Sequence, residues 1–89
     1  MSAKRFIVRG RVQGVNFRTT AAQQAVRLGL NGRIWNREDG AVEAEAVGAD
    51  DALAQFEAWL HRGPSYAHVE SVVAEALPGE PRHRGFAID

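Results

Sequence analysis

Cysteine is absent from this sequence of 89 residues, which excludes disulfide bonds and cysteine-ligated zinc. Net charge is also absent, because 11 Lys and Arg residues balance 11 Asp and Glu residues. A neutral chain lacks the bulk attraction that draws basic proteins to nucleic acids and anionic membranes, although it can still carry a local basic patch. No apolar run approaches the roughly 20 residues of a membrane-spanning helix. We therefore expect no membrane association.

The length and composition set the scale of the fold. Residues 1–89 are expected to form a single domain with one modest core, since so short a chain buries roughly 60–65% of its unfolded surface. Hydrophobic residues make up 45% and charged residues 25%, which is typical of an ordered globular domain. The apolar stretch at 6–8 is too short for the core of a signal peptide. We expect a cytoplasmic protein, with the monomer as the default for so small a chain.

Hydrophobic periodicity predicts the order β-α-β-β-α-β, followed by a short strand at a sheet edge. Strands are predicted over 4–12, 30–37, 41–47, 68–77 and 85–89. Helices are predicted over 17–28 and from 50 or 51 to 61. Asp39-Gly40 indicates a hairpin turn, and residues 78–81 (PGEP) form a turn-rich loop.

Each predicted helix has an apolar stripe and an end signal. The stripe of the first consists of Phe17, Ala21, Ala22, Ala25, Val26 and Leu28. That of the second consists of Leu53, Phe56 and Leu60, with Trp59 beside it. Asp50 or Asp51 is expected to cap the second helix, while Gly29 and Gly63 mark the two C-terminal ends.

This order predicts an α+β, ferredoxin-like βαββαβ two-layer sandwich, in which two helices cover one face of an antiparallel sheet. Right-handed crossovers give the order 4-1-3-2 for the four main strands. Many unrelated functions use this fold, so the function has to be inferred from a site.

The segment between the first strand and the first helix has the features of an anion site. Gly14 allows the backbone to approach a ligand closely, and successive N–H groups can point into one concavity. The N-terminus of the following helix adds unpaired N–H groups and a positive dipole end. Arg18 lies at the helix start, where its guanidinium can grip two phosphate oxygens. An ordinary turn followed by a solvated Arg would leave the same pattern, and the Lys-Ser/Thr ending of a Walker A motif is missing.

Residues 10–18 (GRVQGVNFR) resemble the signature of the acylphosphatase family. Residues 29–36 (GLNGRIWN), followed by 39–43 (DGAVE), resemble its second signature. Phe56, Trp59-Leu60, Gly63-Pro64 and Ala67-x-Val69 also match the family pattern, so the resemblance covers nearly the whole chain.

The resemblance implies a small free-standing enzyme that hydrolyses the carboxyl-phosphate bond of acyl phosphates, releasing a carboxylate and inorganic phosphate. It implies that Arg18 binds the phosphoryl group together with backbone N–H groups of Gly14, Val15, Asn16, Phe17 and Arg18 itself. Asn36 matches the family residue that orients the attacking water. No metal or organic cofactor is implied, and inorganic phosphate is expected to inhibit as a product.

Other candidate sites carry weaker signals. His61, His68 and His83 lack metal-site spacing, and the Ser and Thr residues lack a partner for covalent catalysis. Glu43 and Glu45 share one strand face and are expected to pair with Arg9, Arg11, Arg33 and Arg37 in a cross-strand charge ladder.

Two alternatives remain open from the sequence. A single-stranded RNA-binding sheet uses the same order of elements and would stack bases on Trp35, although its aromatic-rich strand signature is missing. An accessory module of a carbamoyl-transfer system is the other alternative, although such modules are usually fused to zinc-finger segments.

Overall fold

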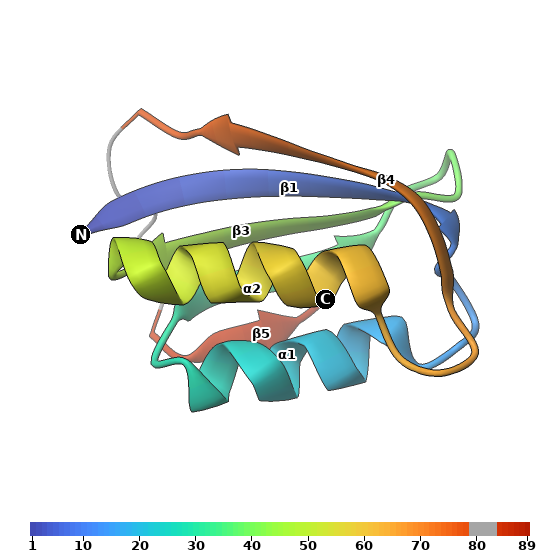
Figure 1. Cartoon of the computed structure of the whole chain (residues 1–89), viewed down its shortest axis with the longest axis horizontal. Helices are drawn as coiled ribbons and strands as arrows, with labels where there is room; N and C mark the ends of the chain where they lie inside the picture. The colour runs from blue at the N-terminus through green and yellow to red at the C-terminus, as the bar shows by residue number, and fades with distance from the viewer. Residues whose placement is uncertain (79–83) are drawn as a thin grey trace.

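The computed structural model describes residues 1–78 and 84–89, and within them it contains two helices and five strands (Figure 1). In chain order these are β1 (Ser2–Arg11), α1 (Phe17–Arg27), β2 (Asn31–Asn36), β3 (Val42–Gly48), α2 (Asp50–Arg62), β4 (His68–Ala76) and β5 (Phe86–Ile88). The predicted helices and strands are all present, with bounds shifted by one or two residues. Most of the predicted loop at 78–81, and His83, lie outside the described residues.

The described strands form one sheet with the order β4-β1-β3-β2-β5, which confirms the predicted 4-1-3-2 order. β1 pairs antiparallel with β3 and β4, and β2 pairs antiparallel with β3. The antiparallel pairing predicted for the four main strands is confirmed, whereas the short strand β5 at the edge pairs in parallel with β2. The reason is that the chain reverses direction after β4, so β5 runs the same way as β2.

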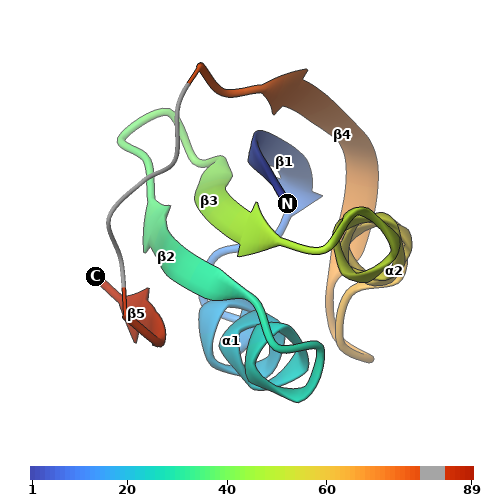
Figure 2. The same cartoon turned by 90° about the vertical axis from the view of Figure 1, so that its left-hand side faces the viewer.

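The two helices cover the same face of the sheet (Figure 2). α2 packs under β1 and β4, while α1 packs under β2 and β5. Alternate residues of the strands point into this layer, and the rings of Phe6 on β1 and Phe56 on α2 meet edge to face at 5.6 Å between centroids. The core thus lies between one sheet face and two helices, as the hydrophobic pattern predicts.

The predicted apolar stripe of α1 is wrong at Val26, whose surface is 61% exposed. Phe17, Ala21, Ala22 and Ala25 are buried as expected. Val26 lies nine residues after Phe17, which at 3.6 residues per turn is half a turn away on the opposite side of the helix. It therefore extends the apolar surface around α1 toward solvent.

The expected aspartate cap of α2 is also wrong. The N-cap is Ala49, which has extended backbone angles, and Asp50 and Asp51 form the first turn of the helix. At that position both carboxylates stabilise α2 through its dipole, and the Asp51 carboxylate accepts the Ala52 N–H at 2.9 Å. Gly63, with φ of 68°, does end the helix as predicted.

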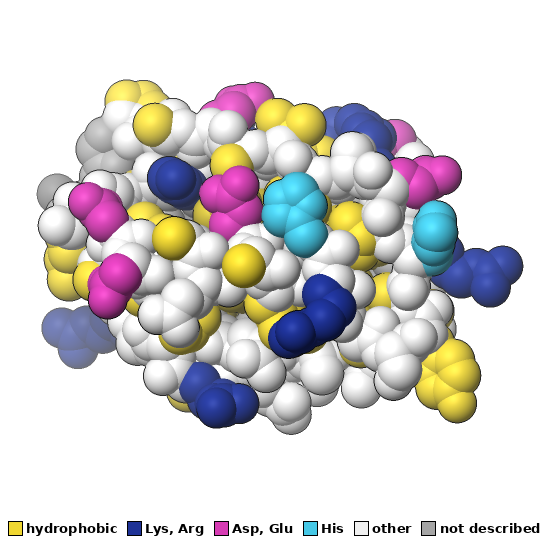
Figure 3. Space-filling model, viewed as in Figure 1, with side chains coloured by type: hydrophobic (Ala, Val, Ile, Leu, Met, Phe, Trp, Pro, Cys, Tyr) yellow, Lys and Arg dark blue, Asp and Glu magenta, His cyan; other side chains and the backbone are white. Residues whose placement is uncertain are grey.

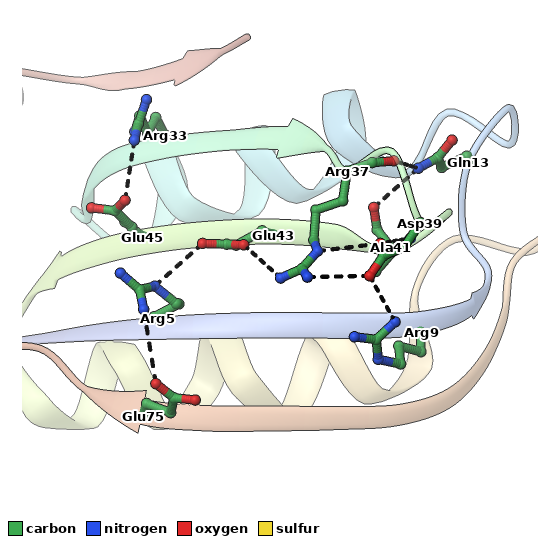
Figure 4. A network of polar contacts seen from close by, with 10 residues as sticks. All are labelled: Arg5, Arg9, Gln13, Arg33, Arg37, Asp39, Ala41, Glu43, Glu45 and Glu75. Atoms are coloured by element: carbon green, nitrogen blue, oxygen red, sulfur yellow. Dashed lines mark hydrogen bonds and ion pairs between the residues drawn. The ribbon is translucent and has the colours of Figure 1, made fainter.

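Ion pairs cover the open face of the sheet (Figure 4). Glu43 contacts Arg5 at 3.2 Å and Arg37 at 2.9 Å, and Glu45 contacts Arg33 at 3.2 Å. The expected ladder is therefore present with three changes. Arg5 takes part, and Arg9 pairs with Asp39 rather than with a glutamate. Within the part of the chain that the structure describes, Arg11 makes no ion pair.

Asp39 is the acceptor at the β2–β3 turn. Its carboxylate accepts the Ala41 N–H at 3.1 Å and contacts Arg9 and Arg37 at 3.2 and 3.1 Å. The Ala41 N–H, followed by the hydrogen bonds from Arg37 and Arg9, holds the pKa of Asp39 below its ordinary value of 3.8. The same contact with Asp39 raises the pKa of Arg37. The charged form of Asp39 therefore stabilises the fold at neutral pH.

We expect Asp39→Asn to lower the melting temperature slightly at neutral pH, since the pairs are exposed to solvent. A group with a lowered folded-state pKa contributes stability above its ordinary pKa and loses it as the pH falls through the folded-state value. The difference from wild type should therefore shrink as the pH falls below 3.8. Thermal unfolding across this range measures it, with Glu38→Gln at an exposed neighbouring carboxylate as control. A difference that stays constant down to acid pH would contradict the assignment.

Candidate active site

The loop from β1 to α1 has an unusual backbone. Gly14 has φ of 75°, and Asn16 has φ of 63° and ψ of 25°, the left-handed conformation. Among the described residues, Asn16 is the only non-glycine residue with positive φ. Asn tolerates this conformation better than most side chains, and residues held in it cluster at functional sites. Alternation of left-handed and right-handed residues turns successive N–H groups toward one side, which creates a concavity for an anion.

The N-terminus of α1 differs from that of α2 in its local charges. Asn16 is the N-cap, but its side chain makes no capping hydrogen bond, and the first turn carries no acidic residue. Its main-chain oxygen instead accepts hydrogen bonds from the Thr20 N–H and the Thr20 hydroxyl. α2, in contrast, has Asp50 and Asp51 in its first turn. The start of α1 is thus electrostatically suited to an external anion.

Arg18 is held in place by the residue that follows β5. Its Nη1 donates to the main-chain oxygen of Asp89 at 2.5 Å. Asp89 is itself fixed, since its N–H donates to the Ile34 oxygen at 2.9 Å and its carboxylate lies 3.7 Å from Arg33. Because Arg18 is half-buried and anchored on one side, its remaining guanidinium N–H groups are available to a ligand at the helix start.

Asn36, the last residue of β2, lies near the start of α1. It is exposed at the end of that strand, and Figure 1 shows that β2 and the β1–α1 loop end at the same side of the molecule. A cavity of about 120 Å³ joins them. It is lined by Val12, Gly14, Asn16, Phe17, Arg18, Thr19 and Asn36. A cavity of that volume can admit a phosphoryl group.

The candidate site residues thus come together around this cavity, except for Val15. The side chain of Val15 packs against the core instead. Phe17 reaches the cavity at the helix start while its side chain is buried, with its ring 5.6 Å from that of Trp59. The role expected of both residues uses the backbone N–H, which does not depend on where the side chain points.

Gln13 is a residue that our sequence analysis did not single out. Its Nε2 donates to the main-chain oxygens of Arg37 at 2.8 Å and Ala41 at 3.0 Å, which joins the β1–α1 loop to the β2–β3 turn (Figure 4). Gln13 precedes Gly14, and Arg37 follows Asn36, so the two hydrogen bonds tie the two halves of the cavity together. A polar side chain in a loop gives no sequence signal of such a long-range contact.

The described residues contain no cluster of metal-ligating side chains. Over residues 1–78 and 84–89, no three His, Asp or Glu side chains gather as a metal site would require, and His61 and His68 are exposed. Within the same ranges, no helix is long and apolar enough to cross a membrane. On the face that carries α2, acidic and basic side chains are interspersed rather than gathered in one large patch (Figure 3).

These features define a small α+β protein with a small cavity between the start of α1 and the end of β2. The family model described as acylphosphatase matches residues 4–88, and the chain belongs to the acylphosphatase family. This confirms the resemblance of the two sequence signatures.

Individual relatives agree with this family assignment. The acylphosphatase of Halorhodospira halophila is 52% identical over 84 residues, covering 94% of this chain and 90% of that protein. The acylphosphatase of Vibrio parahaemolyticus is 44% identical over 88 residues, covering 99% and 97%. The crystal structure of acylphosphatase from Bacillus subtilis has a TM-score of 0.96 at 35% identity, over 100% of this chain and 99% of that chain. The chain is thus an enzyme of the acylphosphatase class, and its family supports acyl phosphate hydrolysis.

We expect Gln13→Met to destabilise the protein by about 1–3 kcal/mol, since two hydrogen bonds are lost. Gln13→Glu should destabilise it more at neutral pH, because a carboxylate would face the two carbonyl oxygens that now accept from Nε2. Denaturant unfolding measures both, with Gln55→Glu on the exposed side of α2 as the matched control. Equal stability of the Met and Glu variants would contradict the bracing role.

Proposed function

We propose that the cavity between the β1–α1 loop and Asn36 binds the phosphoryl group of an acyl phosphate and hydrolyses its carboxyl-phosphate bond without a metal ion. The observation that carries the proposal is the convergence of the uncapped start of α1, Arg18 and Asn36 on one cavity. Membership in the acylphosphatase family supports the reaction itself.

The proposed cradle suits the charge of the transition state. Phosphoryl transfer passes through a loose transition state whose negative charge is spread over the equatorial oxygens. The N–H groups of Gly14, Val15, Asn16, Phe17 and Arg18 and the Arg18 guanidinium donate to these oxygens. Because they are fixed by the helix start and by Asp89, they need little reorganisation as the charge develops.

Asn36 is proposed to position the attacking water. Its neutral amide cannot deprotonate water, but it can hold the oxygen in line with the breaking P–O bond. The water oxygen forms the new bond to phosphorus, and the bond to the carboxylate oxygen breaks. The carboxylate leaves as a weak base, so it requires no general acid. The proton of the water passes to a phosphate oxygen of the substrate.

We propose that residues 1–89 act as one free-standing domain, a monomer in the cytoplasm, with inorganic phosphate as product and inhibitor. The chain spans 97% of its Vibrio parahaemolyticus relative but 12% of the chain described as T. kodakarensis HypF, on which it superposes with a TM-score of 0.86 at 26% identity. The accessory module of a carbamoyl-transfer system is the alternative to the free-standing enzyme.

The RNA-binding alternative has less support than the enzyme. On the open sheet face, the arginines at positions 5, 9, 33 and 37 contact carboxylates. The Arg33 guanidinium lies 4.3 Å from the ring centroid of Trp35, over the aromatic surface on which a base would have to stack.

The purified chain should hydrolyse benzoyl phosphate in a metal chelator, with saturation kinetics and inhibition by inorganic phosphate. Arg18→Ala should lower kcat/KM on the order of a thousandfold, because it removes the charged donor to the transition state. Arg18→Lys should retain only part of the lost kcat/KM, since an ammonium lacks the planar pair of N–H donors that a guanidinium offers to two phosphate oxygens. Arg62→Ala, on the exposed end of α2, is the matched control. A rate no higher than spontaneous hydrolysis, with folded protein, would refute the proposed function.

Asn36→Ala should lower kcat on the order of a hundredfold while changing KM much less, because the water is lost but the phosphate cradle remains. Asn36→Gln keeps the amide but displaces it by one methylene, so we expect an intermediate kcat. Steady-state kinetics of the two variants measure this. A proportional rise in KM at unchanged kcat would instead assign Asn36 to substrate binding.

A further inference from the structure

The side chain of Asn16 makes no hydrogen bond within the described part of the chain. Asn16 is the N-cap of α1, a position where asparagine usually accepts an N–H group of the first turn, yet this capping hydrogen bond is not formed. The left-handed conformation of Asn16 does not require a carboxamide either, because glycine adopts it at lower cost. The fold thus leaves the carboxamide available to a ligand.

Asn16 lies where a ligand of the phosphoryl cavity can contact this carboxamide. It lines the cavity together with Arg18 and Asn36, and it is exposed rather than packed in the core. Its backbone is fixed on both sides. The main-chain oxygen of Asn16 accepts the Thr20 N–H at 3.2 Å and the Thr20 hydroxyl, and the next residue, Phe17, is buried. A short side chain on so fixed a backbone has little freedom to lose when it binds.

An acyl phosphate brings one polar atom that the proposed function does not yet provide for. Arg18 and the backbone N–H groups bind the phosphoryl oxygens, and Asn36 holds the attacking water. The carbonyl oxygen of the acyl group lies close to phosphorus and needs a donor of its own. When the bond from phosphorus to the carboxyl oxygen breaks, its electron pair passes to the carboxylate, so negative charge grows on this carbonyl oxygen in the transition state. A donor fixed beside it stabilises that charge.

We propose that the side-chain amide of Asn16 donates a hydrogen bond to the carbonyl oxygen of the acyl group and stabilises the departing carboxylate. This inference rests on the proposed function, since the phosphoryl group has to occupy the cavity. The amide of Asn16 keeps its protons, and the proton of the water passes to a phosphate oxygen. In an in-line displacement, water and leaving group lie on opposite sides of phosphorus. Two carboxamides from different elements then serve the two sides, Asn36 from β2 and Asn16 from the β1–α1 loop.

The hydrogen bond is expected to act on kcat rather than on binding. The carbonyl oxygen of the bound substrate is neutral, whereas the carboxylate oxygen that it becomes is charged, so the donor contributes more in the transition state than in the ground state. Inorganic phosphate lacks a carbonyl oxygen, and its binding does not involve this donor. The inhibition constant of phosphate therefore separates the carboxamide of Asn16 from the backbone of the same loop.

The test is Asn16→Gly in the full chain, which keeps the left-handed conformation and the backbone N–H and removes the carboxamide. For benzoyl phosphate we expect kcat to fall about tenfold, with the inhibition constant of inorganic phosphate unchanged. The fall should be larger for 4-methoxybenzoyl than for 4-nitrobenzoyl phosphate, because a more basic carboxylate depends more on a donor as it leaves. The control is Gln23→Ala, which removes an exposed amide of α1 that does not line the cavity and should leave these values unchanged.

The other outcomes overturn the proposal, and they separate it from the proposed function. An unchanged kcat in Asn16→Gly would remove the hydrogen bond while the acylphosphatase reaction stands. A fall in kcat with a matching rise in the inhibition constant of phosphate would show that Asn16 only orders the loop. The expected pattern in Thr19→Val, but not in Asn16→Gly, would assign the contact to the hydroxyl of Thr19. Absence of hydrolysis by the wild-type chain would refute the proposed function, and this inference with it.

Discussion

The pairing of two strands with β3 determines where the site can form. β1 and β2 both run antiparallel to β3, so they run parallel to each other. Their last residues therefore lie at the same end of the sheet. Val42 of β3 is the register partner of both Val8 and Asn36, which places these two residues level with each other across one strand. The loop after β1 and the last residue of β2 therefore lie at one end of the sheet. The hydrogen bonds of Gln13 connect this loop to the β2–β3 turn there.

The two faces of the sheet have different electrostatic roles. The covered face packs apolar side chains against the helices, and described polar side chains are not buried there. The open face neutralises its arginines with carboxylates from neighbouring strands, which leaves little charge to attract a polyanion. The first turn of α1, in contrast, carries no acidic residue to offset the positive dipole end of the helix. A chain of zero net charge can thus present a local positive field at one helix start.

Most of the fold was predictable because periodicity reports which face of an element is buried. Periodicity predicted the strands and both helices, right-handed crossovers then gave the strand order, and the two signatures identified the family. Periodicity failed at positions whose environment does not follow the repeat of the helix or strand. Val26 is apolar at a position that faces solvent, and Asp50 looks like a cap but lies inside the helix. The two hydrogen bonds of Gln13 span 24 and 28 residues, a separation on which local sequence is silent.

The anchoring of Arg18 on Asp89 couples its orientation to the docking of β5. β5 has three residues and lies at the sheet edge, where it pairs with a single neighbour. Short edge elements open at lower free energy than central strands. Each opening of β5 would release the oxygen that orients Arg18. The fraction of molecules with a preorganised Arg18 guanidinium therefore depends on the free energy of opening β5, which is lower than that of global unfolding. Amide hydrogen exchange in residues 86–89 measures this opening directly.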